Sequence, residues 1–590
     1  MRKKVSYNLV IKKNKNFFFS KNNDVLIGNW LLEKFHTVLD NKEIKVCTPI
    51  LNSRSVRKDS YLQCDKIFQS IIKDFVDIMN VYHGINFSLR SWKIIAETWL
   101  RRFIYICFNR HKTLKSAFNE FNFNQVFISK NDNFKFFTRD TQALYFASVD
   151  ENWDSNLFYK IIKFFNFDLN LITDETEDRI SNISSIEDFV KKRDLNKNFK
   201  NKIVREILNF FRIFTKKNDK IIFQTYLPFI TEKYIEISLS QFPTYYKEKF
   251  IKFGLFNSNC RERLNFKKSK QVNLENFIRD ILPIALPILM VEDFKNILNN
   301  NYFNLTKKPK IFFTSTNFEN DYLNIFIAKQ INYNRKFKYI VGQHGSSYFS
   351  DYDSNFRTEV NESDFFFSWG YKNNSKKNII PFFNFKTYKR RIRCNSNGNL
   401  LIVFRSLGYR VLPWDRYYEG LSEVKKIIKM FLLLKKSIQN NTILRLHSNF
   451  ERSDYLVNKY IKDLNCSIDF GKKKYLDLLK KTRLVCFNYD STGFLENLSL
   501  NIPSLMLSND IYINKNDFFK KKYEILFKAK LIFDDSKKMS NHINKIWKNI
   551  DKWWFSTDVQ KAIMRFNNNY NITGNQKDLD KLIYFLKNNS

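Results

Sequence analysis

From about residue 310 onward, short and nearly uninterrupted apolar runs alternate with longer stretches whose apolar residues recur at helical spacing. The apolar runs predict buried strands at 310–314, 338–343, 364–370, 399–404, 442–447, 483–488 and 503–507. The stretches between them predict amphipathic helices, for example at 326–331, 475–482 and 493–501. Strands that are apolar throughout and alternate with helices are typical of parallel sheets covered on both faces. We therefore expect an α/β fold.

A polar, basic stretch at Tyr388–Gly398 interrupts this alternation, which restarts at Asn399. The restart predicts two doubly wound, Rossmann-like domains that face each other across a cleft, with ligands bound beyond the carboxyl ends of the strands. We expect an N-terminal domain at 1–390, a C-terminal domain at 391–570 and a terminal helix at 571–590. The first 300 residues read as more helical, with a clear amphipathic helix at 66–80, and in the C-terminal domain a helix at 422–438 is expected to begin at a capping Ser422.

Polar residues gather where the predicted strand at 483–488 gives way to a helix. Asp490, Ser491 and Thr492 stand at this junction, and Glu496 follows about one turn later. One interpretation is structural, because Ser491 or Thr492 can cap a helix and Glu496 can reach back to its start. The other is functional, because the free N–H groups at a helix N-terminus favour an anion such as a phosphate. In that case Glu496 would reach a ribose.

Two histidines also follow predicted strands, in a chain that has six. His344 ends the strand at 338–343 and His447 ends the one at 442–447, so the two would approach the cleft from opposite domains. A single histidine after a strand is usually a structural residue. Two beside the same cleft favour chemistry, as a base or as a partner of phosphate. Arg405, after the strand at 399–404, is a further phosphate candidate.

The charge of the chain suggests other functions. Its 590 residues carry a net charge of +41, which favours nucleic acid as a partner. A genome rich in A and T explains the same excess of Lys together with Asn, Ile and 62 Phe, and no basic block stands out. Nucleic acid is therefore not the expected partner, although a basic surface still favours anionic lipid. Seven scattered cysteines without a CxxC pattern, and no stretch long and apolar enough to span a bilayer, predict a soluble cytoplasmic protein.

Several cofactor and metal motifs are absent from the sequence. No P-loop and no GxGxxG after a strand occurs, which argues against a P-loop NTPase and a dinucleotide enzyme. Asp351 and Asp353 stand in a polar loop and are weak evidence for a metal. We therefore expect neither a cofactor nor a metal.

Five blocks in a fixed order resemble a family of transferases found with bacterial surface-polysaccharide genes, and the cleft pattern resembles the GT-B glycosyltransferases. The blocks are "VLIGNWLLEKF", "NVYHGINFSLRSWKIIAETWL", "VDENWDSNLFYKII", "GQHGSSYFSDYDSNFRTEVNESDFFFSWGY" and "DSTGFLENLSLNIPSLM". A wider similarity is to Kdo- and sialyl-type transferases, whose His-Pro pair and Ser-Ser/Thr pair bind CMP. Here Ser448, not Pro, follows His447, while Ser491-Thr492 matches the second pair.

The resemblance implies metal-independent transfer of a sugar from a nucleotide-activated donor, CMP-linked by the Kdo/sialyl analogy, to a cell-surface glycan or glycolipid. The N-terminal domain would hold the acceptor and the C-terminal domain the donor. The resemblance implies that the donor is held by His447, Ser491, Thr492, Glu496, Arg405 and Ser346. The base would come from the N-terminal domain, with His344 ranked before His83 and with Asp150 or Asp154 as carboxylate alternatives. Peripheral contact with the anionic inner membrane is a further expectation, and a basic nucleic-acid-binding protein or an inactive GT-B-like scaffold are the alternatives.

Overall fold

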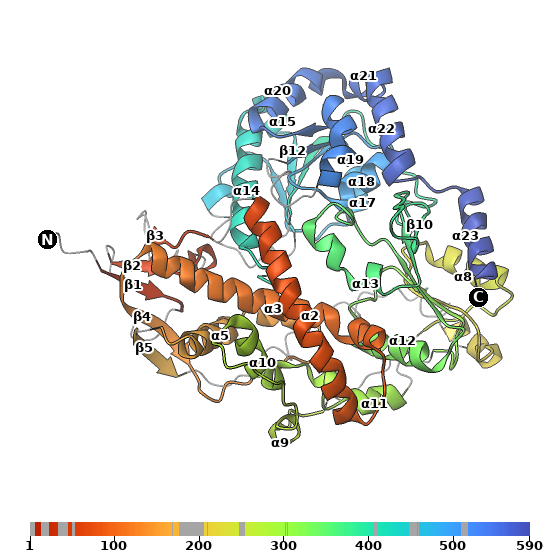
Figure 1. Ribbon diagram of the computed structural model, residues 1–590. Coiled ribbons are helices and arrows are strands. Elements are labelled where there is room, and N and C mark those ends of the chain that lie inside the picture. The colour runs from red at the N-terminus through yellow and green to blue at the C-terminus, as the bar shows by residue number, and fades with distance from the viewer. Residues whose placement is uncertain are drawn as a thin grey trace.

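Short apolar runs form the strands of three all-parallel sheets in the computed structural model of the protein. The structure describes residues 6–12, 23–32, 45–49, 54–167, 169–175, 206–208, 210–246, 254–300, 303, 305–405, 410–447, 457, 459–508 and 517–589. Helices cover the sheets, and the three sheets lie in separate parts of the molecule (Figure 1). The α/β class predicted from the pattern is confirmed.

The C-terminal sheet has the strand order β13-β12-β11-β14-β15-β16. Its strands are β11 (Asn399–Val403), β12 (Thr442–Arg445), β13 (Ser467–Asp469), β14 (Thr482–Phe487), β15 (Ser504–Leu507) and β16 (Ile532–Phe533). Counted from β11, this is the order 3-2-1-4-5-6 of a Rossmann fold, in which the order reverses between β11 and β14. The helices around it are α14 (Arg416–Leu432), α15 (Lys436–Gln439), α17 (Tyr475–Leu479), α18 (Thr492–Ser499), α19 (Asp517–Lys528), α20 (Ser536–Ile546), α21 (Ile550–Trp554) and α22 (Thr557–Tyr570).

The middle sheet has the simple order β10-β9-β8-β7-β6. Its strands are β6 (Ile221–Ile222), β7 (Ile311–Thr314), β8 (Lys338–Gly342), β9 (Phe365–Ser368) and β10 (Ile379–Pro381). α8 (Phe229–Ser238) follows β6, and α12 (Asp321–Tyr333) connects β7 to β8. The stretch Tyr388–Gly398 runs between β10 and β11, which belong to different sheets.

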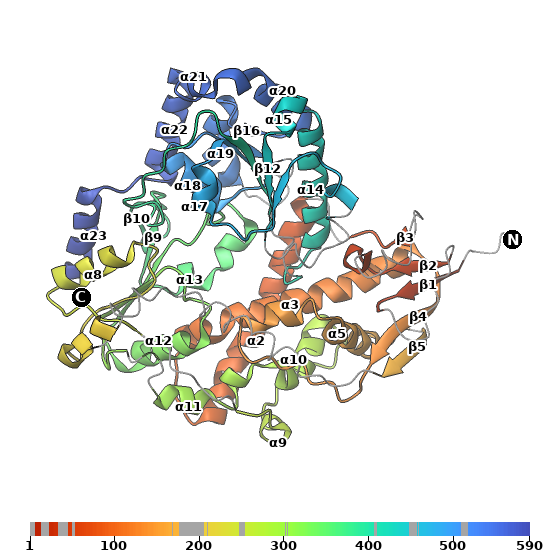
Figure 2. The ribbon, with the colours of Figure 1, turned by 180° about the vertical axis from the view of Figure 1, so that it is seen from behind.

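A third sheet, which the pattern did not reveal, lies in the N-terminal part with the order β3-β2-β1-β4-β5. Its strands are β1 (Tyr7–Val10), β2 (Asp24–Leu26), β3 (Lys45–Val46), β4 (Phe123–Lys130) and β5 (Asn170–Glu175). Two long helices, α2 (Arg54–His83) and α3 (Leu89–Glu120), pack against each other beside it, and α3 also packs on α12 (Figure 2). Further helices of this part are α5 (Glu151–Phe164), α10 (Leu274–Ala285) and α11 (Phe294–Asn299). One hydrophobic core joins the N-terminal sheet, α2, α3 and the middle sheet.

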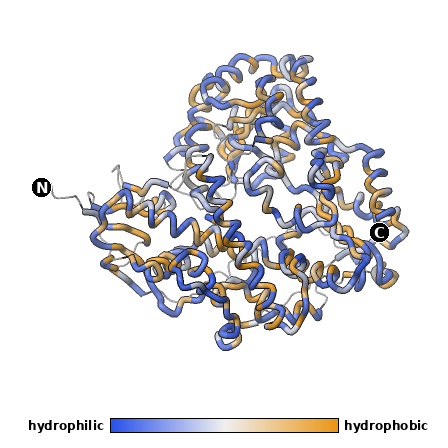
Figure 3. The backbone as a smooth tube through the Cα atoms, in the orientation of Figure 1, coloured by the Kyte–Doolittle hydropathy of each residue, from blue (hydrophilic) through white to orange (hydrophobic). Residues whose placement is uncertain are grey.

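The strands of the C-terminal sheet and the inward faces of its helices form a second core (Figure 3). Within it, the predicted helix at 422–438 is wrong at both ends, because α14 begins six residues earlier and ends at Leu432. Ser422 therefore lies inside α14 and does not cap it. The terminal helix α23 (Gln576–Asn588) leaves this half and buries Leu579, Leu582 and Leu586 against the middle sheet. No described helix is long and apolar enough to cross a membrane.

Candidate active site

A cavity of about 500 Å³ lies between the middle and C-terminal sheets, at the carboxyl ends of β8, β11, β12 and β14. This is the point where the strand order of the C-terminal sheet reverses, and ligands of such sheets bind there. Six of the nine site residues predicted from the sequence line the cavity: His344, Ser346, Arg405, His447, Ser491 and Thr492.

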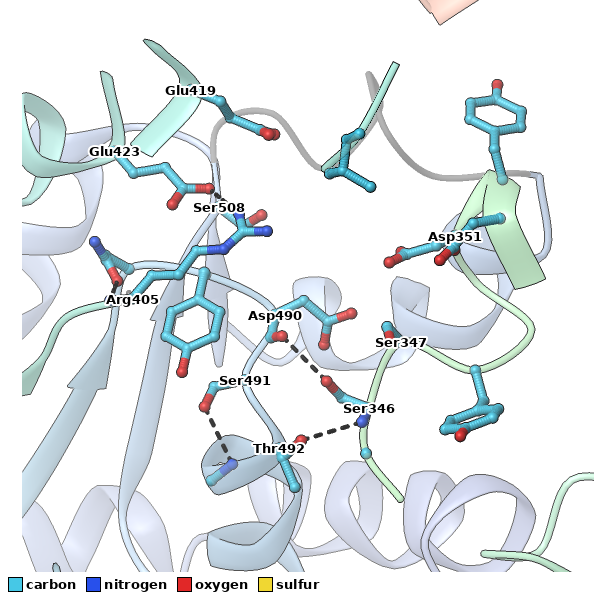
Figure 4. A pocket seen from close by; sticks show the side chains of 18 of the residues that line it. Ser346, Ser347, Asp351, Arg405, Glu419, Glu423, Asp490, Ser491, Thr492 and Ser508 are labelled. Atoms are coloured by element: carbon cyan, nitrogen blue, oxygen red, sulfur yellow. Dashed lines mark hydrogen bonds and ion pairs between the residues drawn. The ribbon is translucent and has the colours of Figure 1, made fainter. Parts of the chain in front are cut away.

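The N-terminus of α18 forms one wall and touches the loop after β8. Ser491 is the N-cap, and its Oγ accepts a hydrogen bond from the Gly493 N–H at 3.1 Å. The Ser346 N–H donates to Thr492 Oγ1 at 3.2 Å, and the Ser346 hydroxyl donates to the Asp490 carbonyl at 3.1 Å (Figure 4). A side chain at Gly345 would come within 2.8 Å of Thr492 Oγ1, so glycine is what allows the two loops to approach. These bonds join the two halves at the cavity.

A second wall follows β11 and β14. The Arg405 N–H donates to Asn488 Oδ1 at 2.9 Å, which directs the Asn488 amide into the wall. The Asn488 side chain is 4% exposed, and its Nδ2 donor has no hydrogen-bond partner among the described residues. A buried amide donor without a partner costs roughly 1–3 kcal/mol, which a bound acceptor atom would recover. Asn488 is therefore a buried donor in the cavity wall that the sequence motifs did not reveal, although its place directly after a strand was a usable signal.

His344 stands where the cavity opens toward the first two sheets. Its Nδ1 lies 2.8 Å from the Tyr226 hydroxyl and 3.2 Å from the Ser315 carbonyl. His344 is exposed toward the cavity, but the protein atoms packed around it, together with the positive charge of Lys386, lower its pKa from 6.5 to about 4. The imidazole is therefore neutral near pH 7, which is the state a base needs.

Tyr226 reaches His344 from a strained loop. Tyr226 has φ +72° and Gln224 has φ +52°, and a left-handed backbone at non-glycine residues costs of order 1–3 kcal/mol. Gln224 Oε1 accepts hydrogen bonds from Thr316 Oγ1 at 3.1 Å and from Asn317 Nδ2 at 3.0 Å, and these bonds hold the loop in place.

The charge of the cavity contrasts with that of the chain. Its lining carries the carboxylates Asp351, Asp353, Glu419, Glu423 and Asp490 but only the basic residues Arg357, Arg405 and Lys426. Arg405 pairs with Glu423 at 2.8 Å, and although burial opposes it, this carboxylate raises the pKa of Arg405. Figure 4 shows this pair on one wall and Asp351 on the opposite one. A long polyanion such as nucleic acid is disfavoured in such a cleft.

A second cavity of about 950 Å³ adjoins the first and shares His344, Tyr348, Asp353, Arg357 and Leu412 with it. It lies among α3, the loop after β6 and the loop after β7. Its remaining lining is rich in amides, hydroxyls and aromatic rings: Thr98, Tyr105, Gln142, Tyr145, Gln224, Tyr226, Phe229, Thr316, Asn317, Phe318 and Phe356. Its arginines are held by carboxylates, as in Arg101 with Glu97 at 2.8 Å.

The structure places the other three predicted residues outside both cavities. His83 is 2% exposed, stacks on Phe294 and donates from its Nε2–H to the Met290 carbonyl at 3.0 Å, and burial lowers its pKa to about 4. Asp154 is buried between Arg110 (2.7 Å) and Arg410 (2.8 Å). The His83 imidazole and the Asp154 carboxylate cannot reach a substrate in the cavity between the sheets. The prediction that they are catalytic is therefore corrected, and both have packing roles.

Glu496 and Asp150 also have structural partners. Glu496 lies 3.8 Å from Lys386 Nζ and 3.9 Å from Arg390, so it joins α18 to the stretch after β10 and does not enter the cavity. Asp150 caps α5 by accepting from the Trp153 N–H at 2.9 Å. Ser448 lies outside the described residues. Conversely, Tyr61 of α2 and Glu419 of α14 line the cavity from positions to which no sequence signal pointed.

Within the part of the chain that the structure describes, no group of three or more His, Cys, Asp or Glu side chains is arranged to hold a metal ion.

The sequence of residues 7–586 matches the LIC12162 family of transferases. The chain belongs to that family. The match covers nearly the whole chain, so the three sheets and both cavities lie inside the family region. No curated protein sequence matches this LIC12162 family member.

Solved structures similar to this transferase cover about half of it and are 9–12% identical to it. The spinosyn rhamnosyltransferase SpnG is 10% identical over 48% of this chain and 73% of its own, with a TM-score of 0.28. HepE from Anabaena, in complex with UDP, is 11% identical over 53% and 89%, with a TM-score of 0.32. The wall teichoic acid polymerase TagF is 12% identical over 49% and 74%, with a TM-score of 0.29. Roles for individual residues therefore rest on the geometry of this chain.

Proposed function

We propose that this LIC12162 family transferase moves a sugar from a nucleotide-activated donor to a hydroxylated acceptor. The observation that carries the proposal is the convergence of six residues from two sheets on one cavity, at the strand-order reversal of a Rossmann-like sheet. Membership in a transferase family supports group transfer as the reaction class.

The cavity at α18 suits the donor. The N-terminus of α18 lies at the cavity, where its dipole favours a phosphate, while Arg405, His447 and the Asn488 amide supply donors. The role of Glu496 as a ribose ligand, inferred from the sequence, would require it to leave its ion pairs, so the proposal assigns it to holding α18 in place.

The second cavity suits the acceptor, and His344 lies between the two. In the proposed step, the acceptor oxygen forms a bond to the anomeric carbon of the donor sugar. The bond from that carbon to the phosphate oxygen breaks, and the nucleotide leaves with the electron pair. The acceptor proton passes to Nε2 of His344, which lies 3.3 Å from the Tyr226 hydroxyl and would exchange that contact for the acceptor, and the N-terminal dipole of α18 stabilises the departing phosphate.

Donor and acceptor identity are finer predictions of the same proposal. The Kdo/sialyl analogy favours a CMP-linked donor, and the surface-polysaccharide resemblance favours a glycan or glycolipid acceptor met by a cytoplasmic enzyme at the inner membrane. The proposed domains at 1–390 and 391–570 would then correspond to the acceptor and donor sides.

Thermal stabilisation by CMP, UDP, GDP and their sugar conjugates tests the donor site. A nucleotide at one hundred times its Kd should stabilise the protein by about 2.7 kcal/mol. Thr492→Ala and His447→Ala should weaken this stabilisation at least about tenfold in Kd while changing the Tm of the free protein little. Asp477→Asn, at an exposed position outside the cavity, is the control. Absence of stabilisation by every nucleotide would reject the proposal, and UDP or GDP ahead of CMP would reject only the CMP assignment.

A further inference from the structure

An exposed apolar surface covers the outer face of α8 and the 3-10 helix η2 (Arg212–Phe214) that precedes β6. Nine of the 23 large apolar side chains that are exposed in the described residues fall between positions 207 and 242. We call this surface the α8 face; the members used below are Phe214, Phe229, Ile230, Tyr234, Ile237 and Phe242.

The α8 face runs along the helix and past its C-terminal end. Ile230, Tyr234 and Ile237 follow the spacing i, i+4, i+7 and therefore form one stripe along the helix. Phe242 follows the end of α8, and its ring lies beside that of Phe214 in η2, with ring centroids 5.2 Å apart. The opposite side of α8 is covered by the rest of the fold, because Ile235 and Leu239 are buried against the middle sheet and α23. α8 is thus apolar on two sides, of which the fold covers one.

Lysines border one end of this face. Gln241, next to Phe242, exchanges two hydrogen bonds with the backbone of Lys220. Burial and the neighbouring charges of Lys310 and Lys587 lower the pKa of Lys220, with Asp219 the nearby carboxylate. Lys217 accepts from the Lys308 N–H at 2.8 Å, so further lysines lie at the same edge.

The other end of the α8 face reaches the second cavity, since Phe229 both belongs to the face and lines that cavity. The α8 face therefore adjoins the proposed acceptor site.

We propose that the α8 face docks on the surface of an anionic lipid bilayer. Exposed aliphatic and aromatic side chains bordered by lysines match the two layers of such a surface, its acyl boundary and its negative headgroups. A contiguous apolar surface is uncommon on a soluble monomer unless it meets a partner, and the lysine border favours an anionic one. Docking on a bilayer does not depend on the proposed glycosyl transfer. Only its purpose, delivery of a lipid-linked acceptor to the second cavity, rests on the proposed function.

The test is flotation of the full-length protein with vesicles of phosphatidylcholine containing graded phosphatidylglycerol. Binding should increase with phosphatidylglycerol and decrease with salt. I230S/I237S should weaken partitioning at least about tenfold, because these side chains are 80% and 58% exposed and free to insert. V81S/V272S, at 83% and 67% exposure elsewhere, is the matched control and should bind as the native protein does.

Equal partitioning of the two double variants, or binding that ignores lipid charge and salt, would overturn the proposal. So would concentration-dependent dimerisation that I230S/I237S abolishes in the absence of vesicles, because the face would then join two copies of the chain. Nucleotide-induced thermal stabilisation of I230S/I237S should equal that of the native protein. A failure of vesicle binding is thereby separated from a failure of the donor site.

Discussion

The buried charge cluster around Asp154 offers a sharp test of whether that residue is structural or catalytic. Its two carboxylate oxygens accept from Arg110 at 2.7 Å and from Arg410 at 2.8 Å. Arg110 also donates to the carbonyls of Ser148 and Arg410, and the Arg410 guanidinium lies 4.3 Å from the Trp30 ring centroid. The cluster joins α3 and α5 to the chain that follows β11, so it links the N-terminal part to the C-terminal half.

Asp154→Ala removes the carboxylate and leaves two buried guanidinium groups without it. Breaking a buried ion pair on one side costs roughly 3–5 kcal/mol, and each charge-assisted hydrogen bond alone contributes about 1.5–3 kcal/mol. We expect the free energy of unfolding to fall by about 3–5 kcal/mol, measured by urea denaturation with tryptophan fluorescence. Asp477→Asn is the control, because the Asp477 carboxylate is 63% exposed and pairs with Lys480 at the surface. This change should alter the free energy of unfolding by less than about 0.5 kcal/mol.

The same cluster fixes the sign of a pH effect. Burial alone would raise the pKa of Asp154, but the Arg110 and Arg410 charges lower it below its ordinary value of 3.8. A lowered folded-state pKa contributes stability that is fully present above the unfolded value and is lost as pH falls through the folded one. The difference in stability between native protein and Asp154→Ala should therefore be constant above about pH 5 and shrink below pH 4. An Asp154→Ala protein of native stability whose turnover falls by roughly 10²–10⁴ would refute this reasoning and restore the catalytic role.

Three more expectations concern titrating and buried groups. Because the pKa of His344 is about 4, the rate of transfer should not depend on this group near neutral pH and should fall as pH approaches 4. Tyr226→Phe should shift the acidic limb of the pH–rate profile, because the Tyr226 hydroxyl contacts the His344 ring. Identical profiles for the native protein and Tyr226→Phe would show that Tyr226 does not influence His344. Burial and the neighbouring Asp140 raise the pKa of Asp321 to about 7, and its Oδ1 has no partner among the described residues. When the pKa of an acid is raised in the folded state, its contribution to stability is fully present below the ordinary value of 3.8 and is lost as pH rises through 7. Asparagine cannot ionise, so Asp321→Asn should raise the Tm more at pH 8 than at pH 5. Leu582→Ala, at a fully buried position of α23, should lower the free energy of unfolding by about 2–5 kcal/mol. Tyr584→Ala, at a position 70% exposed on the same helix, should lower it little. Equal decreases would show that α23 is not anchored to the middle sheet.

The pattern of apolar runs by itself determined β7, β8, β9, β11, β12, β14 and β15, because strands buried on both faces must be apolar at nearly every position. The short strands β10, β13 and β16 were not predicted from it. It also located the loops after β8, β12 and β14, since polar residues cannot continue a buried strand. The N-terminal sheet was not predictable in this way. β2 and β3 have three and two residues, and partly exposed polar positions interrupt β4 and β5. The start of α14 was misread because Ser422 is a residue type that favours the N-cap, although Leu421 and Val424 on either side of it are buried in the C-terminal core.

Only the tertiary structure decided which polar residues line the cavity. Ser491 and Thr492 reach the cavity because α18 starts at the strand-order reversal, whereas Glu496, one turn later, points to Lys386 and Arg390. His344 and His83 look alike in sequence, as single histidines after an apolar stretch. The first ends a strand that opens onto a cavity, and the second ends a helix whose last turn packs against Phe294. Local sequence determines a side chain's chemistry and its secondary structure, but burial and partners come from segments hundreds of residues away, as Arg410 does for Asp154.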